Sequence, residues 1–487
     1  MVRAFLAAIA PSVGRKRIPV SLGAGVSLAA LAVLASPQAA AAAPIACSTP
    51  ALITAIAAVS GGGSVTLAPA CTYTLTAANN STDGGTGLPV ITGVVTIAGN
   101  RATIARSTAG GTPTFRILDV ASTGNLTVDS LTVSNGLMAS NGSTGGAGIY
   151  NHGTLAVSAS TFSNNSSPSG SGVSGGGISS SGQLTVTTST FTGNSAQEGA
   201  GFFNQNVATI SQSTFTNNKA TIYGGGGFVN AYGTTTVSSS TFVGNTGPGG
   251  GAIDNDTTLI VKNSTFYNNS DGGNGGGALQ NFGTATITQS TFSGNTASSG
   301  ADIHNYSYGS VTATVTLSMS IVANGVGGAN CNTNSPPIVD SGYNLDTGTS
   351  CGFSSAQHSL SNTPPQLEAL ASNGGPTQTM ALPLLSPAVD AIPTSVSGCT
   401  GSTDQRGTTR PQGSACDIGA FEVIQSGGDT QPPTIPTGLS ASSVTANQVS
   451  LQWNASTDDV SVTGYTVYRN GTAVGSTGSG GATTYTD

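Results

Sequence analysis

One short phrase, Ser-Thr-Phe-x-x-Asn, recurs through the middle of the chain and limits its fold more than any other feature. Its aromatic residue returns every 24 to 29 residues, at Phe162, Phe191, Phe215, Phe242, Phe266 and Phe292, and Ile321 continues the series. An asparagine stands three residues after each of them, at Asn165, Asn194, Asn218, Asn245, Asn269, Asn295 and Asn324. A repeat of this length is typical of a chain that coils into a solenoid.

Each repeat contains three short stretches that alternate apolar and polar residues, which is the pattern of a β-strand. A strand of three to five residues cannot bury a face alone, but it can pair with its equivalent one coil further on. We therefore predict an all-β protein whose main part is a parallel β-helix. The 70 glycines suit the corners of such a coil, and the 6% of charged residues argue against an ordinary helical protein.

The asparagines that follow the aromatic residues are expected to stack in one column. Their amides can hydrogen-bond along the column, as in other stacked parallel strands. We interpret the column as a structural asparagine ladder; the alternative is a polar strip that binds glycans.

The N-terminal region reads as a secretory signal over residues 1–43, because Arg15, Lys16 and Arg17 precede an uncharged apolar stretch and a run of alanines. The alternative is an uncleaved membrane anchor. Residues 44–60 are predicted to cap the first coil, with a short helix over residues 51–59. We expect no membrane span after removal of the signal.

Six cysteines fit an exported protein whose thiols oxidise. They fall into two flanks of the chain, and this grouping favours pairing in sequence: Cys47 with Cys71, Cys331 with Cys351, and Cys399 with Cys416. Scattered free thiols are the alternative.

The repeats, together with phrases near the C-terminus such as Asp404-Gln405-Arg406-Gly407 and Asp417-Ile418-Gly419-Ala420-Phe421-Glu422, resemble bacterial right-handed parallel β-helix surface proteins with a choice-of-anchor Q tail. Residues 432–470 resemble the start of a fibronectin type III domain, in which Trp453 would be a core residue. The resemblance implies a secreted or cell-surface protein and assigns no catalytic residue.

These features predict a division of the chain into six segments. They are a signal (1–43), a capping segment (44–60), the parallel β-helix (61–330), its disulfide-bearing tail (331–424), a linker (425–431) and an incomplete fibronectin type III β-sandwich (432–487).

Alternation places one residue of each coil outward beside an inward aliphatic residue. This predicted surface column includes Tyr150, Phe203, Asp254, Gln280 and His304, with Asp302 on the same face. Tyr150, Phe203 and Gln280 are candidates for ligand binding. Asp254, Asp302 and His304 are candidate catalytic residues, although their expected separations of about 10 Å or more do not suit direct glycosidic chemistry.

No cofactor is expected, although Asp254 and Asp256 could contribute to a Ca²⁺ site. The acidic formal charge of −7 makes nucleic acid a poor partner. In the tail, Asp390, Asp404, Arg406, Arg410, Asp417 and Glu422 are interpreted as ion pairs that order an end cap, with an arginine-centred catalytic site as the alternative.

The favoured function is a secreted or cell-surface monomer with a binding or structural role that contacts extracellular polysaccharide. The alternatives are a polysaccharide-active glycosidase or lyase with an accessory fibronectin type III module, and a purely mechanical stalk. Whether the protein is an enzyme stays open at this point.

Overall fold

The computed structural model divides the chain into two compact units, one ending at Val423 and one beginning at Ile424. Residues 1–42, which carry most of the predicted signal, lie outside the described residues. The structure describes residues 43–487 except 139–144, 169–173, 274, 310–311, 333–335, 426–432, 446–447, 458–461, 463, 470–471 and 478–482.

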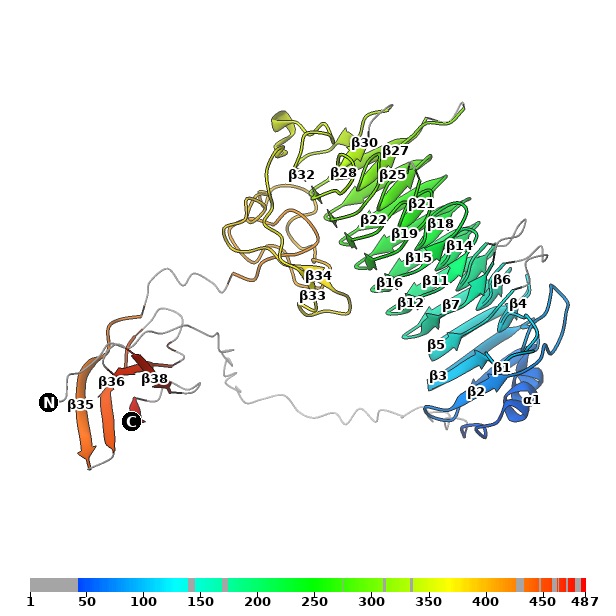
Figure 1. The fold of residues 1–487 in the computed structure, drawn as a ribbon, viewed down its shortest axis with the longest axis horizontal. Coiled ribbons are helices and arrows are strands. Elements are labelled where there is room, and N and C mark those ends of the chain that lie inside the picture. The colour runs from blue at the N-terminus through cyan, green and yellow to red at the C-terminus, as the bar shows by residue number, and fades with distance from the viewer. Residues whose placement is uncertain are drawn as a thin grey trace, which may run out of the picture. The chain divides into compact units, whose positions relative to one another are not determined.

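The larger unit is a right-handed parallel β-helix, as predicted (Figure 1). Each coil contributes one strand to each of three faces, and each strand pairs with its equivalent in the next coil. The rise between coils is therefore the distance between parallel strands, about 4.8 Å.

Face 1 carries the longest strands. They are β1 (Gly62–Thr66), β3 (Val94–Arg106), β5 (Asn125–Ser134), β7 (Thr154–Ser158), β11 (Gln183–Thr187), β15 (Val207–Ser211), β19 (Thr234–Ser238), β22 (Thr258–Lys262), β25 (Thr284–Thr288), β28 (Thr314–Ser318) and β31 (Val339–Asp340).

Face 2 carries the aromatic residue of the repeat, and β3 and β5 continue onto it. Its other strands are β2 (Thr72–Leu75), β8 (Thr161–Ser163), β12 (Thr190–Thr192), β16 (Thr214–Thr216), β20 (Thr241–Val243), β23 (Thr265–Tyr267), β26 (Thr291–Ser293), β29 (Ile321–Ala323) and β32 (Leu345–Asp346).

Face 3 is a separate sheet of nine strands. They are β4 (Leu118–Val120), β6 (Ile149–Asn151), β10 (Ile178–Ser180), β14 (Phe202–Asn204), β18 (Phe228–Asn230), β21 (Ile253–Asn255), β24 (Leu279–Asn281), β27 (Ile303–Asn305) and β30 (Cys331–Asn332). Between faces 2 and 3, the two-residue strands β9 (Ser166–Ser167), β13 (Ser195–Ala196) and β17 (Lys219–Ala220) form a small sheet of their own.

The repeated aromatic residues stack inside the coil. Phe191 and Phe215 lie in parallel planes with their ring centroids 4.8 Å apart, and Phe215 and Phe242 continue the stack at 4.7 Å. A second stack forms from Phe202 and Phe228 on face 3, at 4.5 Å. These rings have no exposed surface, so the spacing of the repeat builds the core.

The asparagines after the aromatic residues form a continuous buried ladder. In a typical rung, Asn218 Nδ2 donates to Asn245 Oδ1 and to the carbonyl of Phe191, each at 2.9 Å. Asn218 Oδ1 accepts from the backbone N–H and the Nδ2 of Asn194, at 3.1 and 2.9 Å. Every polar atom of the amide is therefore paired, which a buried amide requires.

The ladder ends at Asn295, so the predicted inclusion of Asn324 is wrong. Asn324 is exposed and has a positive φ of 57°. Val322, and not Ile321, pairs with Phe292, so Asn324 stands at the position of Gly294, one residue before the ladder. Asn295 Nδ2 donates instead to Asp302 Oδ1, at 2.7 Å. In the next coil, Asn330 fills the equivalent place and donates to the carbonyl of Val322.

A second ladder, of serines, runs beside the first. The serine of the Ser-Thr-Phe phrase accepts a hydrogen bond from the backbone N–H of its equivalent in the preceding coil, as Ser213 Oγ does from Ser189 N at 3.1 Å. It also donates to the carbonyl two residues before it. The sequence carried this signal, because the serine is present in every repeat from Ser160 to Ser320.

The N-terminal end of the coil is covered by helix α1 (Thr49–Val59). Ser48 caps the helix by accepting a hydrogen bond from Ala51 N at 3.4 Å, and Pro50 suits its first turn. Leu52 and Ile56 are fully buried against the first coil. The helix therefore closes the end of the hydrophobic core.

The tail covers the opposite end only in part. Residues around 331–363 follow the last coils and include the 3₁₀ helix η1 (Ser355–Gln357). The following residues, including the short hairpin of β33 (Leu370–Ala371) and β34 (Thr379–Met380), fold back along face 2. There, Thr265 Oγ1 donates to Gln405 Oε1 at 2.7 Å, and Ala420 N donates to Thr291 Oγ1 at 3.0 Å.

The cysteines are bonded in sequence: Cys47 to Cys71, Cys331 to Cys351, and Cys399 to Cys416. The first bond ties the segment before α1 to the start of β2. The other two close loops within the tail, where regular secondary structure is sparse.

The second unit consists of short antiparallel strands that fit a partial β-sandwich. One sheet contains β35 (Thr437–Val444), β36 (Val449–Asn454) and β39 (Thr484–Thr486), and the other contains β37 (Thr466–Arg469) and β38 (Thr472–Ser476). Trp453 is buried and meets the ring of Tyr465 edge-on, with centroids 5.2 Å apart.

Candidate functional site

The predicted surface column on face 3 points away from the core, but most of it is covered. Phe203 is 8% exposed and Gln280 is 4% exposed. Glycine-rich turns cross over the column at very short range: a Cβ on Gly224 would lie 2.5 Å from Cγ2 of Val229, the neighbour of Phe203 in the next coil, and one on Gly275 would lie 2.5 Å from Gln280 Oε1. Phe203 and Gln280 are therefore not available to a large ligand.

Tyr150, at the start of this column, belongs to a buried cluster with Arg116 and Asp119 that was not predicted from the sequence. The Arg116 guanidinium lies 4.5 Å from the centroid of the Tyr150 ring, and its Nη1 lies 3.6 Å from Asp119 Oδ2. Burial raises the pKa of Asp119, while Arg116 lowers it; a hydrogen bond with Asp83 raises it again. His152 packs edge-on against Tyr150.

This cluster does not suit glycosidic chemistry. Two carboxyl groups in direct contact are closer than the roughly 5 to 9.5 Å that glycosidases use. Arg116 and Asp119 also have no exposed surface. We conclude that the cluster orders the first coils. Its members come from separate strands and turns ahead of the regular repeat, which is why spacing alone did not reveal it.

Asp254 lies in the middle of the covered column. Burial raises the pKa of its carboxyl group well above the usual range, and the nearby Asp256, Glu198 and Asp271 raise it further. Among the described residues, none donates a hydrogen bond to Asp254 Oδ1. These surroundings favour the protonated carboxyl group.

Asp256 stands just beyond the strand, where the chain turns from face 3 to face 1, and the residue is exposed. Partial burial of its carboxyl group, together with the charge of Glu198, raises the pKa of Asp256 to about 6. The chain thus places two carboxyl groups of different acidity two residues apart.

His304 and Gln280 are joined across neighbouring coils. Gln280 Oε1 lies 2.9 Å from His304 Nδ1 and accepts from Gly276 N at 3.1 Å. Because an amide oxygen only accepts, His304 Nδ1 carries the hydrogen. Burial lowers the pKa of His304, and Asp271 opposes the shift.

The alternation predicted that Asp302 shares a surface with His304, and this prediction is wrong. It has no exposed surface, and Asn295 donates to its Oδ1. The strand begins only at Ile303, so the alternation does not extend back to residue 302. In earlier coils this place before the strand holds a glycine, such as Gly177 or Gly201. Asp302 is therefore part of the framework.

Several exposed aromatic residues lie instead in the turns that lead from face 3 to face 1. We call Tyr232, Asp256, Phe282 and Tyr306 the edge strip. Backbone hydrogen bonds keep three of these residues in register: Asp256 N donates to Asn230 O, Phe282 N to Asn255 O and Tyr306 N to Asn281 O, at 2.8 to 3.0 Å. In the preceding coil the equivalent donor is Ala231 N, and Tyr232 stands one residue further along the turn. Tyr232 is 62% exposed and Tyr306 is 42% exposed.

The rings of the edge strip are placed by their neighbours. Phe282 and Tyr306 meet edge to face at 6.0 Å, and Tyr306 also packs against His304 at 5.7 Å. For Asp256, Phe282 and Tyr306 the sequence signal was the residue that follows the asparagine of the second repeated phrase, whereas Tyr232 stands two residues after Asn230. The predicted column consists of the residues before these asparagines, which are the covered ones.

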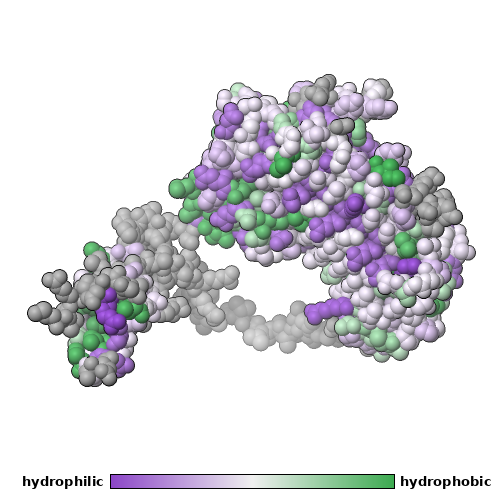
Figure 2. All heavy atoms as spheres, viewed as in Figure 1, coloured by the Kyte–Doolittle hydropathy of each residue, from purple (hydrophilic) through white to green (hydrophobic). Residues whose placement is uncertain are grey.

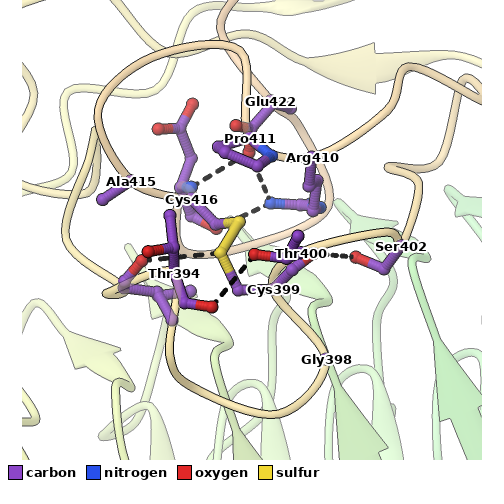
Figure 3. Close-up of a disulfide and its surroundings, with 12 residues drawn as sticks. Thr394, Gly398, Cys399, Thr400, Ser402, Arg410, Pro411, Ala415, Cys416 and Glu422 are labelled. Carbon is purple, nitrogen blue, oxygen red and sulfur yellow. Dashed lines mark hydrogen bonds and ion pairs between the residues drawn. A yellow bond between two sulfur atoms is a disulfide. The ribbon is translucent and has the colours of Figure 1, made fainter.

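The charged residues of the tail form buried ion pairs (Figure 3). Arg410 Nη1 lies 2.8 Å from Glu422 Oε2 close to the Cys399–Cys416 bond, and Arg410 also donates to the carbonyls of Asp417 and Gly419. Arg406 pairs with Asp404 at 2.7 Å. Both guanidinium groups therefore bind carboxylates and carbonyls of the tail itself, which favours a structural role over a catalytic one.

Burial raises the pKa of Asp417 to about 7, and the charge of Glu422 contributes to the rise. The part of the tail that contains these groups lies along face 2, and not over the end of the coil as predicted. Apolar residues such as Ile418 and Phe421 pack between it and the last coils, and this contact fixes the position.

Two further properties bear on function. Within the described residues, no three His, Cys, Asp or Glu side chains are grouped so that they could hold a metal ion. Nor do the described residues include a helix that is long and apolar enough to cross a membrane.

Residues 145–329 match the family model described as the right-handed beta helix region. Among curated proteins, the chain is 63% identical to chitinase Chi52 of Paenibacillus xylanexedens over 49 residues, which are 10% of this chain and 9% of that chitinase. It is 39% identical to chitinase A1 of Niallia circulans over 103 residues, 20% of this chain and 15% of that protein. The chain thus spans less than a sixth of these relatives.

A third curated protein, exoglucanase A of Cellulomonas fimi, is 57% identical over 58 residues, which are 12% of this chain and 6% of that enzyme. Among solved structures, the pectate lyase Pel9A superposes with a TM-score of 0.39 at 16% identity, covering 76% of this chain and 90% of that one.

Proposed function

We propose that this protein is an extracellular β-helix protein that binds neutral polysaccharide along the edge strip. The observation that carries the proposal is the row of rings formed by the exposed Tyr232 and Tyr306 and the half-buried Phe282, with the carboxyl group of Asp256 between them. Aromatic rings offer an apolar face to the C–H side of a sugar, and a carboxyl group accepts hydrogen bonds from its hydroxyls.

The strip is long enough for more than one sugar ring. Tyr232 and Tyr306 belong to coils three steps apart, and the rise of about 4.8 Å per coil separates them by about 14 Å. From Asp256 to Tyr306 the strip follows one register position from coil to coil. An extended glycan chain is therefore a better fit than a single monosaccharide.

The names of the relatives support the choice of ligand. Two of these relatives are named as chitinases and one as an exoglucanase, and short parts of this chain are similar to them. We therefore propose chitin or cellulose chains as the first ligands to test. Pectin and alginate are poorer candidates, because their carboxylates would meet Asp256.

The test measures binding of chito- and cello-oligosaccharides by calorimetry. We expect Tyr232→Ala combined with Tyr306→Ala to abolish binding. Tyr223→Ala is the matched control, because Tyr223 is 61% exposed but lies outside the edge strip. Equal binding by the double variant and the control would remove the edge strip as the site.

A second function, polysaccharide cleavage, is favoured by one observation. Asp254 and Asp256 are about 6.6 Å apart along the chain, and their surroundings give the two carboxyl groups different acidity. An acid and a base of this kind are the parts that a glycosidase needs. The cover over Asp254 counts against it, because a general acid must contact the glycosidic oxygen.

Release of reducing ends from chitin and cellulose distinguishes the two functions. An activity that Asp256→Asn abolishes while oligosaccharide binding persists would establish cleavage. Binding without any release of reducing ends would leave the protein as a binding module.

The remaining assignments also stand as proposals. A signal in residues 1–43 would export the protein, and the choice-of-anchor Q tail with the fibronectin type III segment would place it at or outside the cell surface as a monomer. We retain the predicted boundaries, with the β-helix over 61–330 and its tail over 331–424.

A further inference from the structure

The outward side of face 1 is a regular array of hydroxyl groups. In the seven strands from β7 to β28, the first, third and fifth residues point outward, and all are threonine or serine except Ala156, Gln183, Val207, Ile260 and Lys262. We call this surface the threonine face. Its inward residues, such as Ile210 and Val237, fill the core, so the face cannot rotate or slip.

The array repeats in two directions. Thr209 lies beside Thr236 in the next coil, and Thr284 lies beside Thr314, with no break in register between these strands. Neighbours are about 4.8 Å apart along the coil axis and about 6.6 Å apart along a strand. Threonine has a stiff χ1 angle, so each hydroxyl and methyl group has a defined direction.

The threonine face is open. None of its outward residues is buried, and no other described element of this unit covers it. Figure 2 shows that much of the visible surface of this unit has intermediate hydropathy, which is the character of threonine and serine. By contrast, the tail covers the equivalent outward threonines Thr241, Thr265 and Thr291 of face 2.

The chemistry of the face limits its partners. Within the seven strands, Lys262 is the one charged outward residue and no outward residue is aromatic. A charged polymer would find no complementary charge, and a sugar ring would find no aromatic platform. Single hydroxyl contacts are weak, so useful affinity requires many of them at once. A partner that meets all the rows together must itself be periodic and uncharged.

We propose that the threonine face adsorbs to ice. Each hydroxyl can hold one water molecule by a hydrogen bond, and the methyl groups beside it exclude other water. The waters so held would form a fixed two-dimensional array on the protein. Such an array can merge with a crystal of water, whereas a soluble glycan contacts only a few of its rows. This activity is separate from glycan binding at the edge strip.

The experiment freezes the whole protein slowly from dilute solution and compares its concentration in the ice with that in the remaining liquid. Wild-type protein is expected to be enriched in the ice. Thr209→Tyr with Thr236→Tyr places two large side chains in the middle of the face and is expected to abolish the enrichment.

Thr192→Tyr with Thr216→Tyr is the matched control. These two threonines are also neighbours in adjacent coils, but they lie on face 2. The control pair should keep the enrichment. A gentler pair, Thr209→Val with Thr236→Val, keeps the shape and removes only the hydroxyls, and it should lower the enrichment without unfolding the protein, as circular dichroism would check.

Three results would overturn the proposal. The first is exclusion of the wild-type protein from ice. The second is equal loss of enrichment in the threonine-face pair and the control pair. The third is adsorption to powdered chitin or cellulose that depends on Thr209 and Thr236 in a protein that stays out of ice, which would assign the face to a crystalline glycan.

Discussion

Replacing Asn218 by alanine tests whether the asparagine ladder holds the coils together. The change leaves the backbone N–H of Asn194 without its acceptor inside the core, which costs about 1–3 kcal/mol. It also removes the hydrogen bonds from Asn194 Nδ2 and to the carbonyl of Phe191, worth about 1 kcal/mol each. We therefore expect the free energy of unfolding to fall by about 3–5 kcal/mol.

The matched control is Asn125→Ala, because Asn125 is an exposed residue at the start of β5. This variant should differ from the wild type by less than about 0.5 kcal/mol. Urea unfolding followed by circular dichroism measures both changes. Hydrogen exchange then locates the loss, since coils contact only their neighbours and protection should fall first around residues 191–245.

The reasoning would be refuted if the two variants unfolded at the same urea concentration. In that case, water or backbone shifts would supply hydrogen bonds to the groups that lose Asn218. The ladder would then be a result of the fold and would not stabilise it.

Two further predictions concern the core and the tail. Phe215→Ala removes the centre of the aromatic stack and should lower the free energy of unfolding by about 3–5 kcal/mol in the same urea assay, whereas Thr216→Ala on the outer side should change it little. Folding raises the pKa of Asp417 from 3.8 to about 7, so the protonated carboxyl group contributes fully to stability at low pH, and this contribution is lost between about pH 4 and pH 7. The melting temperature of the wild type should therefore fall over that range. In Asp417→Asn, thermal melting curves should show a smaller fall.

The repeat predicted the coil well, because one physical constraint sets both spacing and residue type. A phenylalanine every 24 to 29 residues stacks only if the chain returns to the same corner, and the asparagine three residues later then meets its equivalent. The prediction failed at Asn324, because Ile321 takes the place of the threonine of the phrase and Val322 that of the phenylalanine. An asparagine three residues after Ile321 is therefore only two residues after the inward side chain. Without the phenylalanine, the sequence did not show this shift of one residue.

The site was harder to predict, because exposure depends on segments that carry no periodic signal. Phe203 points outward as alternation requires, yet the turns rich in glycine cross above it. Asp83, Asp119 and Arg116 meet through the first irregular coils, which the repeat does not describe. The edge strip was present in the sequence, one residue beyond the asparagines of the second phrase at Asp256, Phe282 and Tyr306, and two residues beyond at Tyr232.

The amides of the asparagine column all have the same sense. Each Nδ2 donates toward the following coil and each oxygen accepts from the preceding one, from Asn165 to Asn295. The column therefore has a polarity along the axis of the coil, with acceptor oxygens facing its N-terminal end and donor amides facing its C-terminal end. At its last member, Asn295, the donor is left for a group outside the column, and Asp302 accepts from it.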